Sequence, residues 1–170
     1  MLSKKKWQQY GFKRSKSDIN CIVIHNTNNY ENNAEELEYW LENECKTSQG
    51  THYLVDNKEV RQVMPFDYGV YSTGKGKDYC SIHSIAIEIC SNLNNDLYLQ
   101  GQDKAIELIK ELMGTYNITK DELYFHIDFN SKFYCPANIL NLYGNKKNFL
   151  DKFFGGQEWY KHYMTQEAIN

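Results

Sequence analysis

The run Cys21-Ile22-Val23-Ile24-His25 constrains the fold more than any other segment, because it is apolar and rich in β-branched residues up to the histidine. Successive residues of a strand point to opposite faces, so a strand made of this run carries apolar side chains on both faces. Both faces must then be covered by other parts of the chain. The run is therefore expected to be a central strand that delivers His25 at its carboxyl end.

Segments with the spacing of strands alternate along the chain with segments that have the spacing of helices. Helices are expected at residues 33–44, 101–116 and 145–154, and further strands at 51–56, 59–63, 84–90 and 123–126. This alternation predicts an α/β fold with a single domain over residues 1–154, in which helices flank a central mixed sheet of about five or six strands. The first helix is expected to pack through Trp40. Residues 155–170 are expected to be a C-terminal tail or linker stump.

The composition excludes several classes of partner. The formal net charge is -3 and the basic residues cluster only at Lys4-Lys5-Lys6, so nucleic acid is not expected as a partner. Only Arg14 and Arg61 are arginines among the 19 basic residues, which leaves few side chains for bidentate phosphate contacts. No apolar stretch follows the charged beginning of the chain, so neither a secretory signal nor a membrane anchor is expected. Synthesis in the cytoplasm follows from this, and the sequence leaves the oligomeric state open.

The cysteines indicate free thiols. The chain has five of them, an odd number with irregular spacing, at Cys21, Cys45, Cys80, Cys90 and Cys135. A disulfide framework would require an even and more regular set, so a reducing compartment is expected at synthesis.

A short segment from Phe125 to Pro136 carries three chemically active side chains, His126, Lys132 and Cys135. Its histidine and cysteine resemble half of a metal site, and His25 is the upstream residue that completes it. Three such ligands and one open position would make a catalytic zinc centre.

An acidic residue interrupts another apolar strand. In the segment 84–90, Ile85, Ile87 and Ile89 share one face, and Glu88 lies on the other. A carboxylate in such a place is either a member of a structural ion pair or a catalytic base, and the catalytic interpretation is favoured because a metal site is expected nearby.

Four segments, 22–27, 51–56, 84–90 and 126–136, together resemble the zinc-dependent N-acetylmuramoyl-L-alanine amidases of the type 2 amidase and peptidoglycan-recognition-protein superfamily, which includes phage endolysins and bacterial autolysins. The resemblance implies an amidase-like fold and a bacteriolytic hydrolase. Such an enzyme cleaves the amide between N-acetylmuramic acid and the L-alanine of the peptidoglycan stem peptide. A protein made without a signal would act on the cell wall after its release.

The resemblance also implies roles for individual residues. It implies zinc (Zn²⁺) bound by His25, His126 and Cys135, with Glu88 as the proton-transferring base and Lys132 facing the oxyanion of the tetrahedral intermediate. The family does not use His52 as a ligand, and it is expected near the cleft or in the core, as a substrate contact in the first case; Tyr71 is also expected to contact the substrate.

The chain departs from the family pattern beside Cys135. Two residues, Phe133 and Tyr134, separate Lys132 from Cys135 where the usual pattern has one. If the loop cannot keep both in place, Lys132 is expected to be displaced, because a metal ligand is the tighter constraint.

Two alternatives stand beside the amidase. A non-catalytic peptidoglycan-binding module of the same fold would have lost its cysteine ligand, which this chain retains. A metal-free cysteine hydrolase using Cys135 and His126 is the weaker alternative, because such enzymes usually place the nucleophile at a helix start with its histidine well apart in sequence.

Overall fold

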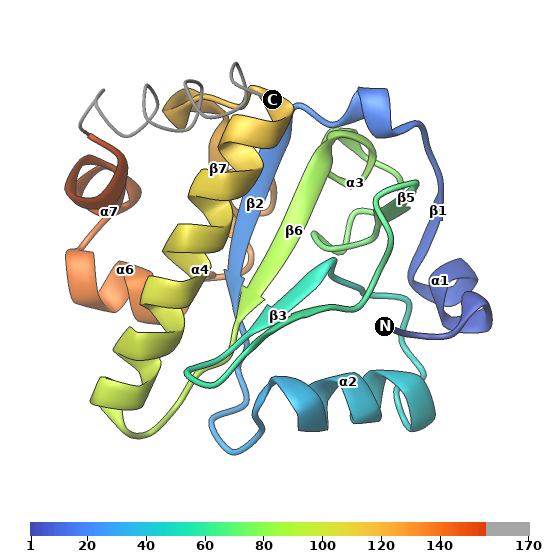
Figure 1. The fold of residues 1–170 in the computed structure, drawn as a ribbon, viewed down its shortest axis with the longest axis horizontal. Helices are drawn as coiled ribbons and strands as arrows, with labels where there is room; N and C mark the ends of the chain where they lie inside the picture. Colours follow the sequence, from blue (N-terminus) through green and yellow to red (C-terminus); the bar gives the residue numbers. More distant parts are fainter. Residues whose placement is uncertain (156–170) are drawn as a thin grey trace, which may run out of the picture.

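The computed structural model of this protein describes residues 1–155, so the expected tail 155–170 lies almost entirely outside the described residues. Helices and strands are interspersed along the chain (Figure 1). The helices are α1 (Lys4–Tyr10), α2 (Ala34–Asn43), α3 (Tyr79–His83), α4 (Asn95–Tyr116), α5 (His126–Phe129), α6 (Ala137–Tyr143) and α7 (Lys146–Phe154), with single 3-10 turns at Lys16–Asp18 and Lys120–Glu122. The strands are β1 (Gly11–Lys13), β2 (Cys21–Asn26), β3 (Tyr53–Val55), β4 (Val60–Gln62), β5 (Tyr68–Val70), β6 (Ser84–Ile89) and β7 (Leu123–Phe125).

The main sheet is mixed and has five strands in the order β4-β3-β6-β2-β7. The strands β3, β6, β2 and β7 are parallel, and β4 is the antiparallel edge strand. All six residues of β2 are buried between its two neighbours, because both faces of this strand are covered. The predicted central strand and the predicted α/β fold are confirmed. A separate two-stranded sheet of β1 and β5, which the sequence did not indicate, lies outside the main sheet.

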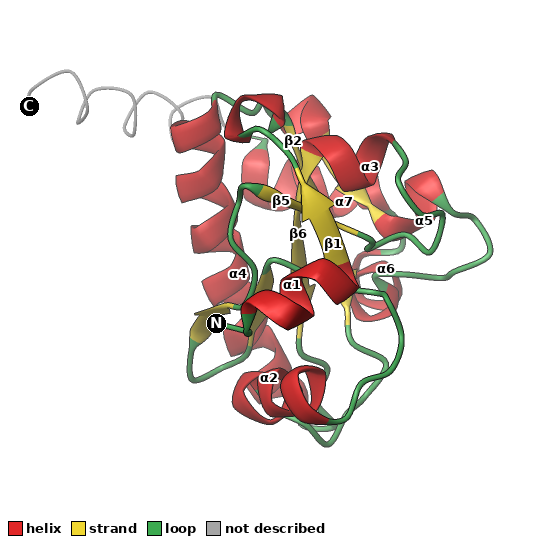
Figure 2. Cartoon of the chain, turned by 90° about the vertical axis from the view of Figure 1, so that its right-hand side faces the viewer, coloured by secondary structure: helices red, strands yellow, loops and turns green. Residues whose placement is uncertain are grey.

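Each face of the sheet has its own hydrophobic core. Ile85, Ile87 and Ile89 of β6 pack against α4 and α7, whereas Ala86 and Cys90 belong to the core on the side of α1 and α2. Burying one isoleucine side chain contributes about 1.5–3 kcal/mol, so the alternation along β6 fixes which way the strand faces. Viewed from the side, α4 forms one upright flank of the molecule (Figure 2).

The starts of two helices show how capping decides a boundary. The helix α2 begins after Asn33, whose side chain accepts a hydrogen bond from the Glu36 backbone, as expected. The helix α4 begins at Asn95, six residues before the predicted start at 101. The Asn94 side chain caps it by accepting from the backbone N–H groups of Asp96 and Leu97.

Trp40 corrects another expectation. It is 43% exposed and does not pack α2, which is anchored instead by Ala34 and Leu41. The sequence spacing placed Trp40 on the buried side because it follows Leu37 by three residues, whereas the face that is buried runs through Leu37 to Leu41, four residues on.

A buried carboxylate joins α2 to the hairpin of β3 and β4. One oxygen of Asp56 accepts a hydrogen bond of 2.8 Å from the backbone of Ala34, at the start of α2. The other accepts hydrogen bonds of 2.7 and 2.8 Å from Lys58 and Glu59 in the hairpin turn. Since Asp56 is only 5% exposed, water cannot easily replace these contacts.

The substitution Asp56→Ala is therefore expected to destabilise the protein. It leaves the buried N–H of Ala34 without an acceptor, and we expect the free energy of unfolding to fall by about 2–4 kcal/mol. Urea unfolding followed by circular dichroism measures this change. Asp67→Ala, which removes an aspartate from an exposed pair with Lys13, is the control and should change stability little. Equal losses in the two variants would contradict this account.

Candidate metal centre and its cleft

A cleft of about 630 Å³ lies at the carboxyl ends of β2 and β6. Clefts at this edge are the usual ligand sites of parallel sheets, because the loops that follow the strands meet there. Figure 1 shows α2 below the ends of both strands. The cleft is lined by residues of β2 and the loop after it, by Leu37, Trp40 and Leu41 of α2, by Glu88, and by Phe133, Tyr134 and Cys135.

Three potential metal donors meet on one side of the cleft. One ligand atom each of His25, His126 and Cys135 lies within 4.8 Å of the others, and all three residues are buried. The pairing of β2 with β7 brings the histidines together, because Ile24 pairs with Phe125 and each histidine follows directly. The two imidazole centroids are 4.8 Å apart.

The cysteine reaches this position through its own backbone contact. The N–H of Ile127 donates a 3.0 Å hydrogen bond to the carbonyl of Cys135, so the loop returns to the histidine that it left. His126 is the first residue of the short helix α5 and is not part of strand β7, which ends at Phe125. The predicted strand 123–126 is thus one residue too long.

A backbone carbonyl fixes the ring of His126. Its Nε2–H donates a 3.2 Å hydrogen bond to the carbonyl of Thr73, which leaves Nδ1 with the lone pair. The same carbonyl accepts a 2.9 Å bond from the Asn130 amide, and the Phe133 ring stacks on the imidazole at 5.0 Å. The chain turns at Gly74, whose φ of 71° favours glycine. Nothing in the sequence indicates Thr73, because a contact through a backbone carbonyl leaves no side-chain signature.

Burial sets the protonation of the donors. It lowers the pKa of His25 to about 3, with a smaller contribution from neighbouring His126, and it also lowers the pKa of His126. Both rings are therefore neutral, the form that binds metals. Burial raises the pKa of Cys135 to about 12, so a thiolate there requires a cation beside it. This argues against Cys135 as a metal-free nucleophile.

Glu88 lies beside the donors and opens onto the cleft. It pairs with His25 across the parallel strands, and one of its carboxylate oxygens is 3.9 Å from His25 Nδ1. The other oxygen, Oε2, is buried and has no hydrogen-bond partner among the described residues. Burial raises the pKa of Glu88 to about 8, close to the range in which a carboxyl group can both take and return a proton.

The structure does not bring Lys132 to this site. Its side chain is exposed and, within the described part of the chain, does not line the cleft, whereas Phe133 and Tyr134 do. The loop accommodates the extra residue before Cys135, and Cys135 still lies beside His25 and His126. The expectation that Lys132 faces the oxyanion is corrected.

Tyr71 lies next to the cleft. It lines a neighbouring depression together with Lys46, and the two hollows share Thr47 and Gln49. Its ring contacts Phe12 at a centroid distance of 5.5 Å.

His52 is a structural residue. It is 0% exposed, its Nδ1 accepts a 3.0 Å hydrogen bond from the Ala86 backbone, and its Nε2 lies 2.9 Å from the Tyr68 carbonyl. Because Nδ1 accepts, Nε2 carries the proton and donates to Tyr68. A buried ring with both nitrogens bonded cannot touch a substrate, so the expectation for His52 is corrected.

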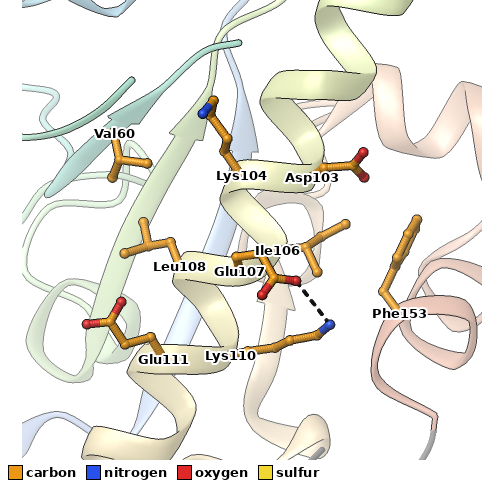
Figure 3. A pocket seen from close by; sticks show the side chains of 9 residues that line it. All are labelled: Val60, Asp103, Lys104, Ile106, Glu107, Leu108, Lys110, Glu111 and Phe153. Atoms are coloured by element: carbon orange, nitrogen blue, oxygen red, sulfur yellow. Dashed lines mark hydrogen bonds and ion pairs between the residues drawn. The ribbon is translucent and has the colours of Figure 1, made fainter. Parts of the chain in front are cut away.

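A second hollow lies on the outer side of α4 (Figure 3). Lys110 pairs there with Glu107 at 3.4 Å, and Phe153 of α7 closes one side. Its charged groups belong to an exposed helix face and do not converge as those of the cleft do. Among the described residues, no helix has both the length and the hydrophobicity needed to cross a membrane.

Comparisons with known proteins agree on one family. A family model described as N-acetylmuramoyl-L-alanine amidase matches residues 15–138. The N-acetylmuramoyl-L-alanine amidase CwlA of Bacillus subtilis is 34% identical over 122 residues, which are 71% of this chain and 44% of CwlA. This chain thus spans less than half the length of that relative.

Two solved structures share the fold over most of both chains. The catalytic domain of PlyG superposes with a TM-score of 0.79 at 25% identity, covering 92% of each chain. The catalytic domain of XlyA gives a TM-score of 0.69 at 28% identity, covering 80% of this chain and 88% of that one.

The buried state of His52 predicts a pH dependence of stability. Burial lowers its pKa to about 3, whereas the unfolded chain takes up the proton near pH 6.5. Stability is therefore lost as the pH falls through this window, and His52 alone should account for about 2 kcal/mol between pH 6.5 and 4.5. The control is His52→Gln, which cannot titrate. Urea unfolding at pH 6.5 and at pH 4.5 gives the free energies of unfolding of the unmodified protein and of His52→Gln. The difference between these two free energies should be about 2 kcal/mol smaller at pH 4.5. A difference that does not change with pH would contradict the assignment.

Proposed function

Because this chain belongs to the N-acetylmuramoyl-L-alanine amidase family, we propose that it hydrolyses the amide bond between N-acetylmuramic acid and the L-alanine of the peptidoglycan stem peptide. The observation that carries the proposal is the convergence of His25, His126 and Cys135 beside Glu88 in one cleft. The family match alone leaves a binding module possible. A complete donor set with a carboxylate next to it supports a hydrolase instead.

The donor set fits zinc. Two neutral imidazoles and one thiol make the combination of nitrogen and sulfur ligands that zinc prefers, and three protein ligands leave one position open. The Nδ1 of His25 lies 3.8 Å from Cys135 Sγ, a separation that one zinc ion bound to both atoms would span. Bound zinc would polarise the substrate carbonyl and lower the pKa of a water molecule to about 7.

Glu88 is the proposed base. Its raised pKa and its unpaired Oε2 allow it to accept a proton from the attacking water and to return it to the leaving amine of L-alanine. The carboxylate is held by a six-residue strand paired on both sides, so its position relative to His25 is fixed. With Lys132 at the surface, we assign no side chain to the oxyanion.

The lining of the cleft suits a muramyl peptide. Amide side chains that can bond to sugar hydroxyls and peptide groups are supplied by Asn28, Asn29, Asn32 and Gln49. Trp40 and Tyr134 are 43% and 57% exposed and offer flat apolar surfaces at the same cleft. The neighbouring depression extends the cleft, and we place Tyr71 there as a contact for the part of the substrate beyond the cleaved bond.

The site of action follows from the substrate. A hydrolase of peptidoglycan acts on the cell wall, so we propose that this chain works there. The relatives that carry the same family name, among them CwlA of Bacillus subtilis, support this assignment.

A digestion assay on purified cell walls tests the proposal. The protein should release new L-alanine amino termini, lose this activity after removal of metal by a chelator, and regain it when zinc is added. Calcium or magnesium added in place of zinc is the control, because these ions prefer oxygen ligands. Full activity after complete metal removal would exclude the zinc mechanism, and the absence of new amino termini would exclude the amidase.

Two substitutions separate binding from turnover. Glu88→Gln keeps the size of the side chain but removes the base, so we expect retained zinc and a loss of about 10²- to 10⁴-fold in kcat. Cys135→Ser should lose both zinc and activity, whereas Cys21→Ala, which removes a buried thiol outside the donor set, should keep both. Zinc content and kcat are measured on the same samples. A fully active Glu88→Gln variant would overturn the assignment of the base.

A further inference from the structure

We propose that Asn26 is the positioning residue that fixes Cys135 relative to His25. This inference rests on the proposed function, because it concerns the same metal site. Asn26 follows His25 directly in β2 and is 5% exposed. Successive residues of a strand point to opposite faces, so the Asn26 side chain is directed away from the donors and cannot itself be a ligand.

The carbonyl oxygen of the Asn26 side chain holds the start of α6. It accepts hydrogen bonds of 3.1 Å from the backbone of Asn138 and 3.4 Å from the backbone of Ile139. These are N–H groups of the first turn, which have no acceptor within the helix. Since α6 begins at Ala137, two residues after Cys135, the contact ties the chain that leaves Cys135 to the strand that carries His25.

The amide nitrogen of Asn26 fixes the orientation of this side chain. Its Nδ2 donates a 3.1 Å hydrogen bond to the hydroxyl of Tyr98 and a 3.4 Å bond to the carbonyl of Ile89. A rotation by 180° would direct Nδ2 at two N–H groups and the oxygen at a carbonyl, so only one orientation satisfies every contact. Tyr98, which is 3% exposed, holds the amide from the side of α4.

The backbone of Asn26 contacts the cysteine as well. Its carbonyl lies 3.9 Å from Cys135 Sγ, within the range of a weak sulfur hydrogen bond. The residues before Cys135 contact the His126 side of the site, because the Phe133 ring stacks on that imidazole and the Phe133 carbonyl accepts a 2.9 Å hydrogen bond from the Cys135 N–H. Asn26 therefore connects the cysteine to the sheet both through its backbone and, by way of α6, through its side chain.

Residues that orient metal ligands in this way affect how tightly the metal is bound. Loss of an outer contact of this kind typically weakens metal binding about 10- to 100-fold, since the ligand must then be ordered when the ion binds. Removal of Asn26 should therefore weaken zinc binding even where the protein stays folded. A residue that serves only to cap a helix would lower stability and leave the metal unaffected.

The test measures metal binding in the full chain with three substitutions. Zinc affinity is determined by competition with a chromophoric chelator, and cobalt(II) is used as a second probe whose absorption reports the thiolate ligand and the geometry. Asn26→Ala should bind zinc about 10- to 100-fold more weakly and show reduced cobalt–thiolate absorption. Asn94→Ala is the matched control, because it also removes an asparagine that accepts from two helix N–H groups, at α4. It should lower the thermal midpoint with unchanged metal affinity.

Tyr98→Phe keeps the inference testable if Asn26→Ala does not fold. It removes only the hydroxyl that orients the amide and should weaken zinc binding about three- to tenfold. In the Asn26→Ala background it should have no further effect, because it acts through Asn26. Zinc affinity within twofold of the unmodified chain in Tyr98→Phe and in every folded Asn26 variant would overturn the inference and leave the proposed function intact. An unmodified chain that binds no zinc would overturn both.

Discussion

The parallel pairing of β2 with β6 and β7 is the constraint on which the candidate site depends. It sets His25 opposite Glu88 on one side and next to the position of His126 on the other. If the register of β2 against β6 or β7 shifted by one residue, the side chain at the paired position would turn to the other face of the sheet and leave the cleft. The register is held by the isoleucines of β2 and β6, which can be buried against α4 in only one alignment.

The burial that holds the strands also prepares the chemistry. Both faces of the sheet are covered, and the resulting desolvation is the main cause of the shifted pKa values of His25, Cys135 and Glu88. Neutral imidazoles and a carboxyl group that titrates near neutral pH thus follow from the packing of apolar side chains. The packing that forms the core therefore also sets the protonation of the residues in the candidate site.

The sequence predicted those features that depend on the spacing of residues along strands. His25 was found because it ends a run that is apolar on both faces, and Glu88 because it interrupts a regular alternation. His126 and Cys135 were found because they share one short segment with a recognisable pattern. It failed where position depends on the path of a loop or on a contact between distant segments. Lys132 lies in a loop with an additional residue, and His52 is buried by contacts with Tyr68 and Ala86 that its own neighbours do not reveal.

The alternation of side chains along β2 has a consequence for protein engineering. His25 belongs to the layer that faces the cleft, whereas its neighbour Asn26 reaches Tyr98 in the opposite layer, beneath α4. If Asn26 has the proposed role, a redesign of the α4 layer for higher thermal stability would alter the candidate metal site without changing any of its donors. The buried layer beneath α4 is linked to that site through the Asn26 amide.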